Sequence, residues 1–114
     1  IMHELGILSS MLKTLDQIMI DENLSSIEKV VLRVGEISGV VPAYIEECYP
    51  AAVYKTKYEN MQLEMEVVPG IVRCNDCKKE FNAYLHDLKC PNCGSQDLFP
   101  LSGREFMIKE IIAC

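Results

Sequence analysis

Apolar residues recur at steps of three and four positions through the first segment of the chain. The stripe consists of Leu5, Leu8, Leu12, Leu15 and Met19, and it is widened by Met11 and Ile18. Because this period matches the turn of an α-helix, the pattern predicts an amphipathic helix from residue 2 to about residue 23. An apolar stripe of this kind must be covered, so we expect the helix to pack on a sheet.

Two later segments alternate between apolar and polar side chains, which is the period of a half-buried strand. In residues 27–37, one side carries Val30, Leu32 and Val34, while the other carries Lys29, Val31 and Arg33. In residues 61–67, the odd positions are apolar and the even positions are polar. Each segment is therefore expected to form a strand.

A second helix is expected between these strands. Pro42 suits the first turn of a helix, and apolar residues continue from there through Ala52. Pro50 removes a backbone donor, so it is expected to kink or interrupt this helix.

The segment from about residue 71 to residue 99 has a different character, with paired cysteines, many polar residues and few aliphatic ones. Such a segment cannot bury an adequate core by itself, so we expect it to need a metal to fold. After it, Phe106, Ile108 and Ile112 are expected to share one face of a last strand that returns the chain to the first sheet.

Length and charge restrict the class of protein. The 114 residues suffice for one domain, or for a small α/β body that carries a smaller module. The net charge of −6 disfavours a nucleic-acid partner, because such proteins gather Lys and Arg on a basic face. No apolar run approaches the roughly 20 residues that cross a bilayer, and the N-terminus lacks the order of a secretory signal. We therefore expect a cytoplasmic protein without a membrane partner.

Four of the six cysteines form two CxxC pairs, and these are Cys74, Cys77, Cys90 and Cys93. Twelve residues separate the pairs, so two tight knuckles can bring four thiolates around one tetrahedral ion. Pro91 presets the second turn, and Gly94 tolerates the positive φ that follows it. The pattern predicts a structural Zn²⁺ site with no open position for water or substrate.

Other metal or redox assignments explain less of this pattern. A rubredoxin-like iron centre would use the same sulfurs and a redox pair would use one CxxC, but neither explains the second pair together with the surrounding body. His86 lies between the pairs and could replace a sulfur, although a solvated loop histidine is the simpler interpretation. Cys48 and Cys114 are expected to be a buried apolar group and a terminal thiol.

Several motifs spread along the chain belong together: Met2-His3-Glu4-Leu5, Val34-Gly35-Glu36-Ile37, Val41-Pro42, the four-cysteine module, and Gly103-Arg104-Glu105 before the last strand. Together they resemble the HypA/HybF family of hydrogenase-maturation nickel metallochaperones. The resemblance implies an α+β fold, in which a small three-stranded sheet carries two helices and a four-cysteine zinc-ribbon module is inserted between the second and third strands. Residues 1–69 and 101–114 would form the nickel-binding α/β domain, and residues 70–100 the zinc-binding domain.

By the same resemblance, His3 supplies an imidazole to Ni²⁺, backbone nitrogens around Met2, His3 and Glu4 complete a nitrogen-rich plane, and Glu4 tunes or contacts the ion. Square-planar nitrogen coordination suits nickel, and a chain terminus can release its ion to a receiving protein. Ni(II) would thus be transferable cargo and Zn(II) structural. The implied partners are a nickel-handling maturation GTPase, the immature large subunit of a [NiFe]-hydrogenase and, as for some relatives, urease maturation proteins.

One feature departs from the family motif, which begins at the initiator methionine, because Ile1 precedes Met2 here. If Ile1 carries a free amine, that amine, two amides and the His3 imidazole would form a different square-planar chelate, which is a hypothesis. Nickel spectra with and without Ile1 test it, and unchanged spectra would reject it.

Two other classes of function have less support in the sequence than a nickel carrier. A zinc-ribbon interaction module for nucleic acid or transcription machinery is the alternative, and it requires a basic face and salt-sensitive oligonucleotide binding. An enzyme is not expected, because the sequence has no nucleophile motif, no phosphate-binding glycine loop and no open-site zinc pattern.

Overall fold

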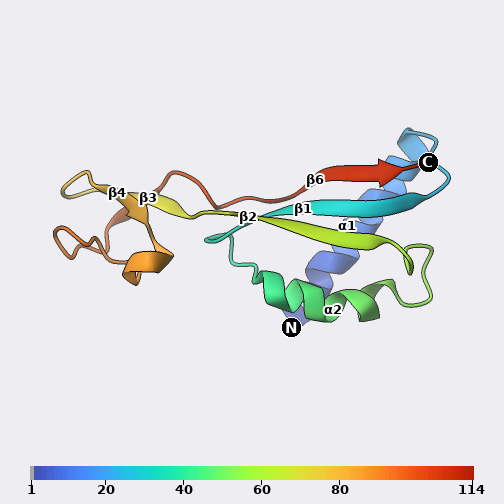
Figure 1. Cartoon of the computed structure of the whole chain (residues 1–114), viewed down its shortest axis with the longest axis horizontal. Helices are drawn as coiled ribbons and strands as arrows, with labels where there is room; N and C mark the ends of the chain where they lie inside the picture. The colour runs from blue at the N-terminus through green and yellow to red at the C-terminus, as the bar shows by residue number, and fades with distance from the viewer. Residues whose placement is uncertain (1) are drawn as a thin grey trace.

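The computed structural model describes residues 2–114 and shows an elongated molecule with principal extents of 54, 27 and 17 Å (Figure 1). Its elements in chain order are α1 (Met2–Asp21), β1 (Ile27–Gly35), α2 (Pro42–Val53), β2 (Gln62–Val68), β3 (Ile71–Cys74), β4 (Glu80–Asn82), the 3-10 helix η1 (Tyr84–His86), β5 (Leu98–Pro100) and β6 (Phe106–Ala113). The strands form a larger sheet in the order β2-β1-β6 and a smaller one in the order β4-β3-β5. The predicted α+β class is confirmed, and the smaller sheet is inserted between β2 and β6.

Helix α1 confirms the apolar stripe read from the sequence, since Leu8 and Leu15 are fully buried. The helix ends in a Schellman-like arrangement, in which the Leu24 N–H donates to the Met19 carbonyl at 2.9 Å. Asn23 takes the left-handed conformation there, with φ of 54°, which Asn tolerates better than most residues. Local sequence therefore determines where this helix stops.

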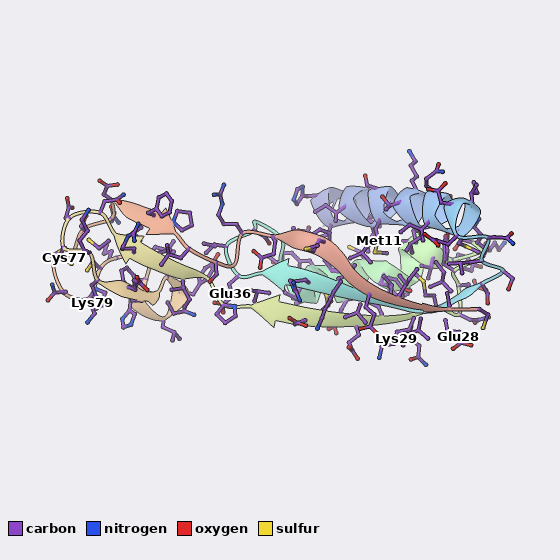
Figure 2. The ribbon with its side chains drawn as sticks, turned by 90° about the horizontal axis from the view of Figure 1, so that it is seen from above. Met11, Glu28, Lys29, Glu36, Cys77 and Lys79 are labelled. Carbon is purple, nitrogen blue, oxygen red and sulfur yellow. The ribbon has the colours of Figure 1, made fainter. Side chains whose placement is uncertain are left out.

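The larger sheet is central to the body of the molecule. Strand β1 pairs in parallel with β2 and antiparallel with β6. Its residues Val30, Leu32 and Val34 are fully buried as predicted, on the face that the helices cover. Figure 2 shows α1 on one side of this sheet. The opposite face is open and carries ion pairs such as Lys29 with Glu64, whose Nζ and Oε1 atoms lie 2.8 Å apart.

Helix α2 is continuous through Pro50. Of the two predicted effects of this proline, the interruption does not occur, and the kink stays a prediction. Proline removes one backbone donor, and the carbonyl of Glu46 that would have used it belongs to an exposed residue, where water can replace the bond. Burial of Ile45, Cys48 and Val53 holds the opposite face of the helix. Across the described residues, no helix is long and apolar enough to span a membrane.

Strand β6 corrects the predicted face of the last strand. Val31 pairs with Glu110 and Leu32 with Ile108, so Lys109 is an extra residue on β6 and forms a bulge. A bulge reverses the side to which the following residues point.

The burial of β6 changes side at this bulge. Phe106 and Ile108 pack on the core as predicted. Beyond the bulge, Ile111 and Ala113 pack on the core instead, and Ile112 is 42% exposed.

The smaller sheet has its own apolar cluster of five buried residues, which are Val72, Cys74, Phe81, Ala83 and Cys90. Two of the five are cysteines of the CxxC pairs, so little aliphatic area remains to stabilise this part. Its folding must therefore depend on what the cysteines bind.

Candidate metal centre

The two CxxC pairs lie on two knuckles of the same construction (residues 74–79 and 90–95). In each knuckle, the N–H four positions after the first cysteine donates to the carbonyl of that cysteine at 2.8 Å, from Lys78 to Cys74 and from Gly94 to Cys90. Both donors take positive φ, 69° at Lys78 and 75° at Gly94. The positive φ of Gly94 was predicted from the sequence, but that of Lys78 was not. The signal was present, because Lys78 follows the first cysteine of its pair by the same four positions as Gly94 does.

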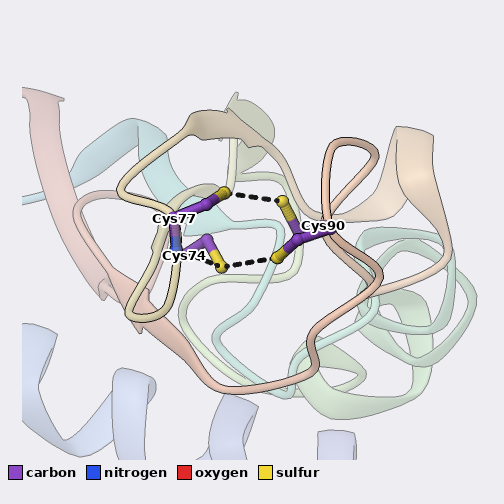
Figure 3. Close-up of side chains that lie close together, drawn as sticks. Cys74, Cys77 and Cys90 are labelled. Atoms are coloured by element: carbon purple, nitrogen blue, oxygen red, sulfur yellow. Dashed lines mark hydrogen bonds between the residues drawn. The ribbon is translucent and has the colours of Figure 1, made fainter.

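The knuckles bring the four sulfurs together (Figure 3). The Sγ atoms of Cys74 and Cys93 are 3.5 Å apart, those of Cys77 and Cys90 are 3.4 Å apart, and all four lie within 4.8 Å of one another. Tetrahedral zinc with Zn–S bonds of about 2.3 Å requires sulfurs about 3.8 Å apart. The spacing and the all-sulfur donor set therefore fit Zn²⁺.

Neighbouring groups shift the acidity of these thiols in different directions. The backbone N–H of Cys77 holds the pKa of Cys74 below its usual value, and a hydrogen bond from the Asn92 side chain lowers the pKa of Cys77 to about 6. The Ser95 backbone lowers the pKa of Cys93, but the adjacent sulfurs, Cys74 first, raise it to about 12. Four thiols this close resist full ionisation, and a divalent cation removes that resistance.

A polar clasp joins the first knuckle to the chain that follows the second. The Asn75 side chain donates to the Asp97 carboxylate at 3.0 Å, and the Asn75 backbone N–H donates to the Asp97 carbonyl at 2.9 Å. Ser95 also donates from its hydroxyl to the Asp76 carboxylate. These bonds orient the two knuckles relative to each other, as outer groups around metal ligands commonly do.

The remaining candidate ligands lie outside this cluster. His86 is exposed, and its ring meets the Phe81 ring edge to face, with centroids 5.7 Å apart and planes at 82°. Cys48 is buried in the core of the larger sheet. Cys114 is exposed, with its Sγ 3.5 Å from the Glu28 carboxylate. Among the described residues, the group able to hold a metal therefore consists of the four paired cysteines.

The two candidate nickel residues lie on the first turn of α1, in the body of the molecule. His3 is exposed, whereas Glu4 is buried with 4% of its surface accessible. His3 also borders a groove of about 700 Å³ between α1 and β6. Ile1, whose amine enters the hypothesis of a different chelate, lies outside the described residues. In Figure 2, Cys77 lies at the far end of the smaller sheet, well away from α1, so the structure does not bring the two sets of residues together.

Comparisons with known proteins indicate one family over nearly the whole chain. Residues 2–113 match the family model described as "HypA: Hydrogenase/urease nickel incorporation, metallochaperone, hypA". The hydrogenase maturation factor HypA of Geotalea uraniireducens is 36% identical over 110 residues, covering 96% of this chain and 97% of that protein. The protein of the same name from Chlorobium luteolum is 32% identical over 111 residues, covering 97% and 95%.

Solved structures share the fold. The solution structure of the Ni metallochaperone HypA from Helicobacter pylori superposes with a TM-score of 0.66 at 19% identity, covering 96% of both chains. A structure titled "Solution structure of HypA protein" gives a TM-score of 0.66 at 20% identity, with 100% of this chain and 98% of the other covered. Because the family model matches residues 2–113, the chain belongs to the HypA family of hydrogenase and urease nickel-incorporation proteins, which are metallochaperones and not enzymes.

Proposed function

We propose that this chain holds Ni(II) at the start of α1, through His3, and delivers it for [NiFe]-hydrogenase maturation, while the four cysteines hold a structural Zn(II). The observation that carries the proposal is an exposed imidazole on the first turn of a helix, remote from a closed cluster of four sulfurs. An accessible nitrogen site can exchange its ion, whereas a site with four thiolates around the metal has no open position for exchange.

The first turn of α1 also offers backbone nitrogens. An amide nitrogen binds Ni(II) only after it has lost its proton, and in the first turn of a helix that loss breaks no hydrogen bond of the helical ladder. The backbone nitrogens around Met2, His3 and Glu4 would each release a proton to solvent on binding. With the imidazole they supply a nitrogen-rich plane of the kind nickel accepts. The burial of Glu4 favours a role in tuning this turn over direct contact with the ion.

The division of labour corresponds to two domains. Residues 1–69 and 101–114 would form the nickel-binding domain, and residues 70–100 the zinc-binding domain. The separate apolar clusters of the two sheets support this division. Zn(II) in the second domain would neutralise the crowded thiolates and fix the two knuckles, which is structural chemistry without a reaction step.

Partner contact must supply the selectivity, since nitrogen donors of this kind bind Cu²⁺ more tightly than Ni²⁺. The proposed partners are a nickel-handling maturation GTPase and the immature large subunit of a [NiFe]-hydrogenase, with urease maturation proteins as further candidates. We propose the cytoplasm as the compartment, because four thiols must remain reduced to bind zinc.

The alternative of a nucleic-acid module receives no support from charge. Residues 70–100 contain four basic and four acidic side chains, so the zinc ribbon has no excess of positive charge with which to bind a phosphate backbone.

Nickel titration of the zinc-loaded protein tests the proposal, with calorimetry and the visible d–d absorption as readouts. His3→Ala should abolish binding at the N-terminal site without loss of zinc or of fold, because His3 is exposed and its removal affects stability by less than about 0.5 kcal/mol. The matched control is His86→Ala, which removes the other histidine of the chain and should leave nickel binding unchanged.

Unaltered nickel binding in His3→Ala would contradict the proposal. So would nickel that binds with wild-type affinity only after the four thiolates have lost zinc. Glu4→Gln separates the two roles of that residue through the d–d spectrum. A tuning role weakens nickel affinity and leaves the spectrum of the loaded protein unchanged, whereas loss of a directly bound carboxylate oxygen changes the spectrum as well.

A further inference from the structure

The larger and smaller sheets meet at a junction built from three stretches of chain, residues 35–37, 68–71 and 102–104. The turn after β1 reaches across it. The Glu36 N–H donates to the Val68 carbonyl at 2.9 Å, and the Ile37 N–H donates to the Gly103 carbonyl at 2.9 Å. The Ile37 side chain then packs against the apolar cluster of the smaller sheet. One short turn of the body therefore touches both segments that lead into and out of the zinc ribbon.

The Glu36 side chain adds a carboxylate to this crossing, where Figure 2 places it between the two sheets. Its Oε1 accepts the Gly70 N–H at 2.8 Å and the Asn82 side-chain amide at 3.0 Å. Asn82 belongs to β4, so the second bond joins the body directly to the zinc ribbon. Hydrogen bonds to an ionised carboxylate are stronger than neutral ones, and both are partly shielded from water here.

Backbone packing shows that the junction is tight. A Cβ on Gly35 would lie 2.0 Å from the Gly103 carbonyl oxygen, and a Cβ on Gly103 would lie 2.6 Å from the Gly70 Cα. Gly103 also has φ of +85°, which side chains rarely adopt. Three segments thus touch through glycines, which is unlike the exposed, extended chain that connects independently moving domains.

From these contacts we infer that Glu36 is a positioning residue that locks the zinc ribbon in one orientation relative to the α/β body. The inference goes beyond nickel carriage and does not depend on where nickel binds. It assigns a role to the glutamate of the Val34-Gly35-Glu36-Ile37 motif, which neither metal site uses.

The test measures whether the two sheets move as one body in the full zinc-loaded chain, by ¹⁵N relaxation and residual dipolar couplings. The wild-type protein should fit one alignment tensor. Asn82→Asp keeps the side-chain oxygen that accepts the Tyr84 and Leu85 N–H groups, but it replaces the amide donor with an oxygen that faces Glu36. The alignment order of residues 71–100 should then fall to roughly half that of the body, while zinc content stays unchanged.

A conservative substitution should keep the lock. Both bonds end on the same oxygen of Glu36, so in Glu36→Gln the amide oxygen can take its place, accept the Gly70 N–H and the Asn82 amide, and leave a single tensor. Asn60→Asp is the matched control for Asn82→Asp, because it adds the same charge at an exposed turn of the body and should leave one tensor.

Glu36→Ala keeps the test decisive if Asn82→Asp loses zinc, because it removes both bonds without changing any residue of the ribbon. The proposal is overturned if Glu36→Ala or a zinc-loaded Asn82→Asp still fits one tensor, or if Glu36→Gln loses the single tensor as Glu36→Ala does. Nickel binding is not part of the readout, so failure here leaves the proposed function intact.

Discussion

The α/β body and the zinc ribbon are held together by different physical means. Among the described residues, the core cluster of the body has thirteen buried members, whereas that of the ribbon has five, two of which are metal-ligand candidates. The body carries thirteen acidic and seven basic side chains, and residues 70–100 carry four of each. Stability in the body thus comes from apolar burial, and in the ribbon we expect it to depend on the proposed metal ion. A perturbation that disables one part should leave the other folded.

Removal of zinc should have the largest effect and should be confined to the ribbon. Structural zinc contributes about 10–16 kcal/mol in zinc-finger peptides, more than any single core side chain. We expect chelation, or Cys90→Ser, to abolish the amide protection of β3, β4 and β5 while β1 and β6 keep theirs. Hydrogen exchange with mass spectrometry measures both parts at once.

Cys114→Ser is the control for that substitution, because Cys114 is exposed and lies outside the four-sulfur cluster. Loss of protection throughout the chain after chelation would show that the body also depends on zinc, and the contrast between the two parts would be wrong.

A cavity in the body should have the next largest effect, in the opposite region. Leu32 is fully buried in the core of the larger sheet, so Leu32→Ala should lower the free energy of unfolding by about 2–5 kcal/mol. Urea denaturation followed by circular dichroism measures this change, and zinc content should stay at the wild-type level. Ile20→Ala, at a position 73% exposed, should change stability by less than about 0.5 kcal/mol.

The smallest effect is expected for a polar contact that ties α1 to the loop after α2. The Tyr58 hydroxyl donates to the Asp16 carboxylate at 2.5 Å, and this bond, followed by Lys57, holds the pKa of Asp16 below its usual value. Because Asp16 is about half exposed, Tyr58→Phe should cost no more than about 1 kcal/mol.

The pH dependence of that contact follows from the sign of the shift. A carboxyl whose pKa is lower in the folded state stabilises the protein above its unfolded pKa of about 3.9, and the stabilisation is lost as pH falls through the folded pKa. The stability difference between wild type and Tyr58→Phe should therefore shrink in acid. Tyr54→Phe, at a residue 61% exposed, should show no such dependence, and an equal trend in both variants would reject the assignment.

Local patterns predicted the elements well and predicted their exceptions poorly. The stripe through Leu8 and Leu15 and the alternation through Leu32 survive in the structure because each reflects one continuous period. The predicted face of Ile112 is wrong, because one extra residue at Lys109 reverses the side of the sheet to which the later side chains point. A bulge depends on which residues the partner strand presents, so the alternation of β6 alone does not reveal it.

The sequence alone determined where the helices and main strands lie and that four cysteines cluster, because helical period, strand alternation and ligand spacing are short-range properties. The class of fold followed from the family resemblance of its motifs. Only the tertiary structure decided that Glu36 faces Gly70 and Asn82, and that Gly35 meets Gly103 without room for a side chain. These contacts join residues 34 to 68 positions apart, and nothing within a single segment specifies which distant backbone will lie against it.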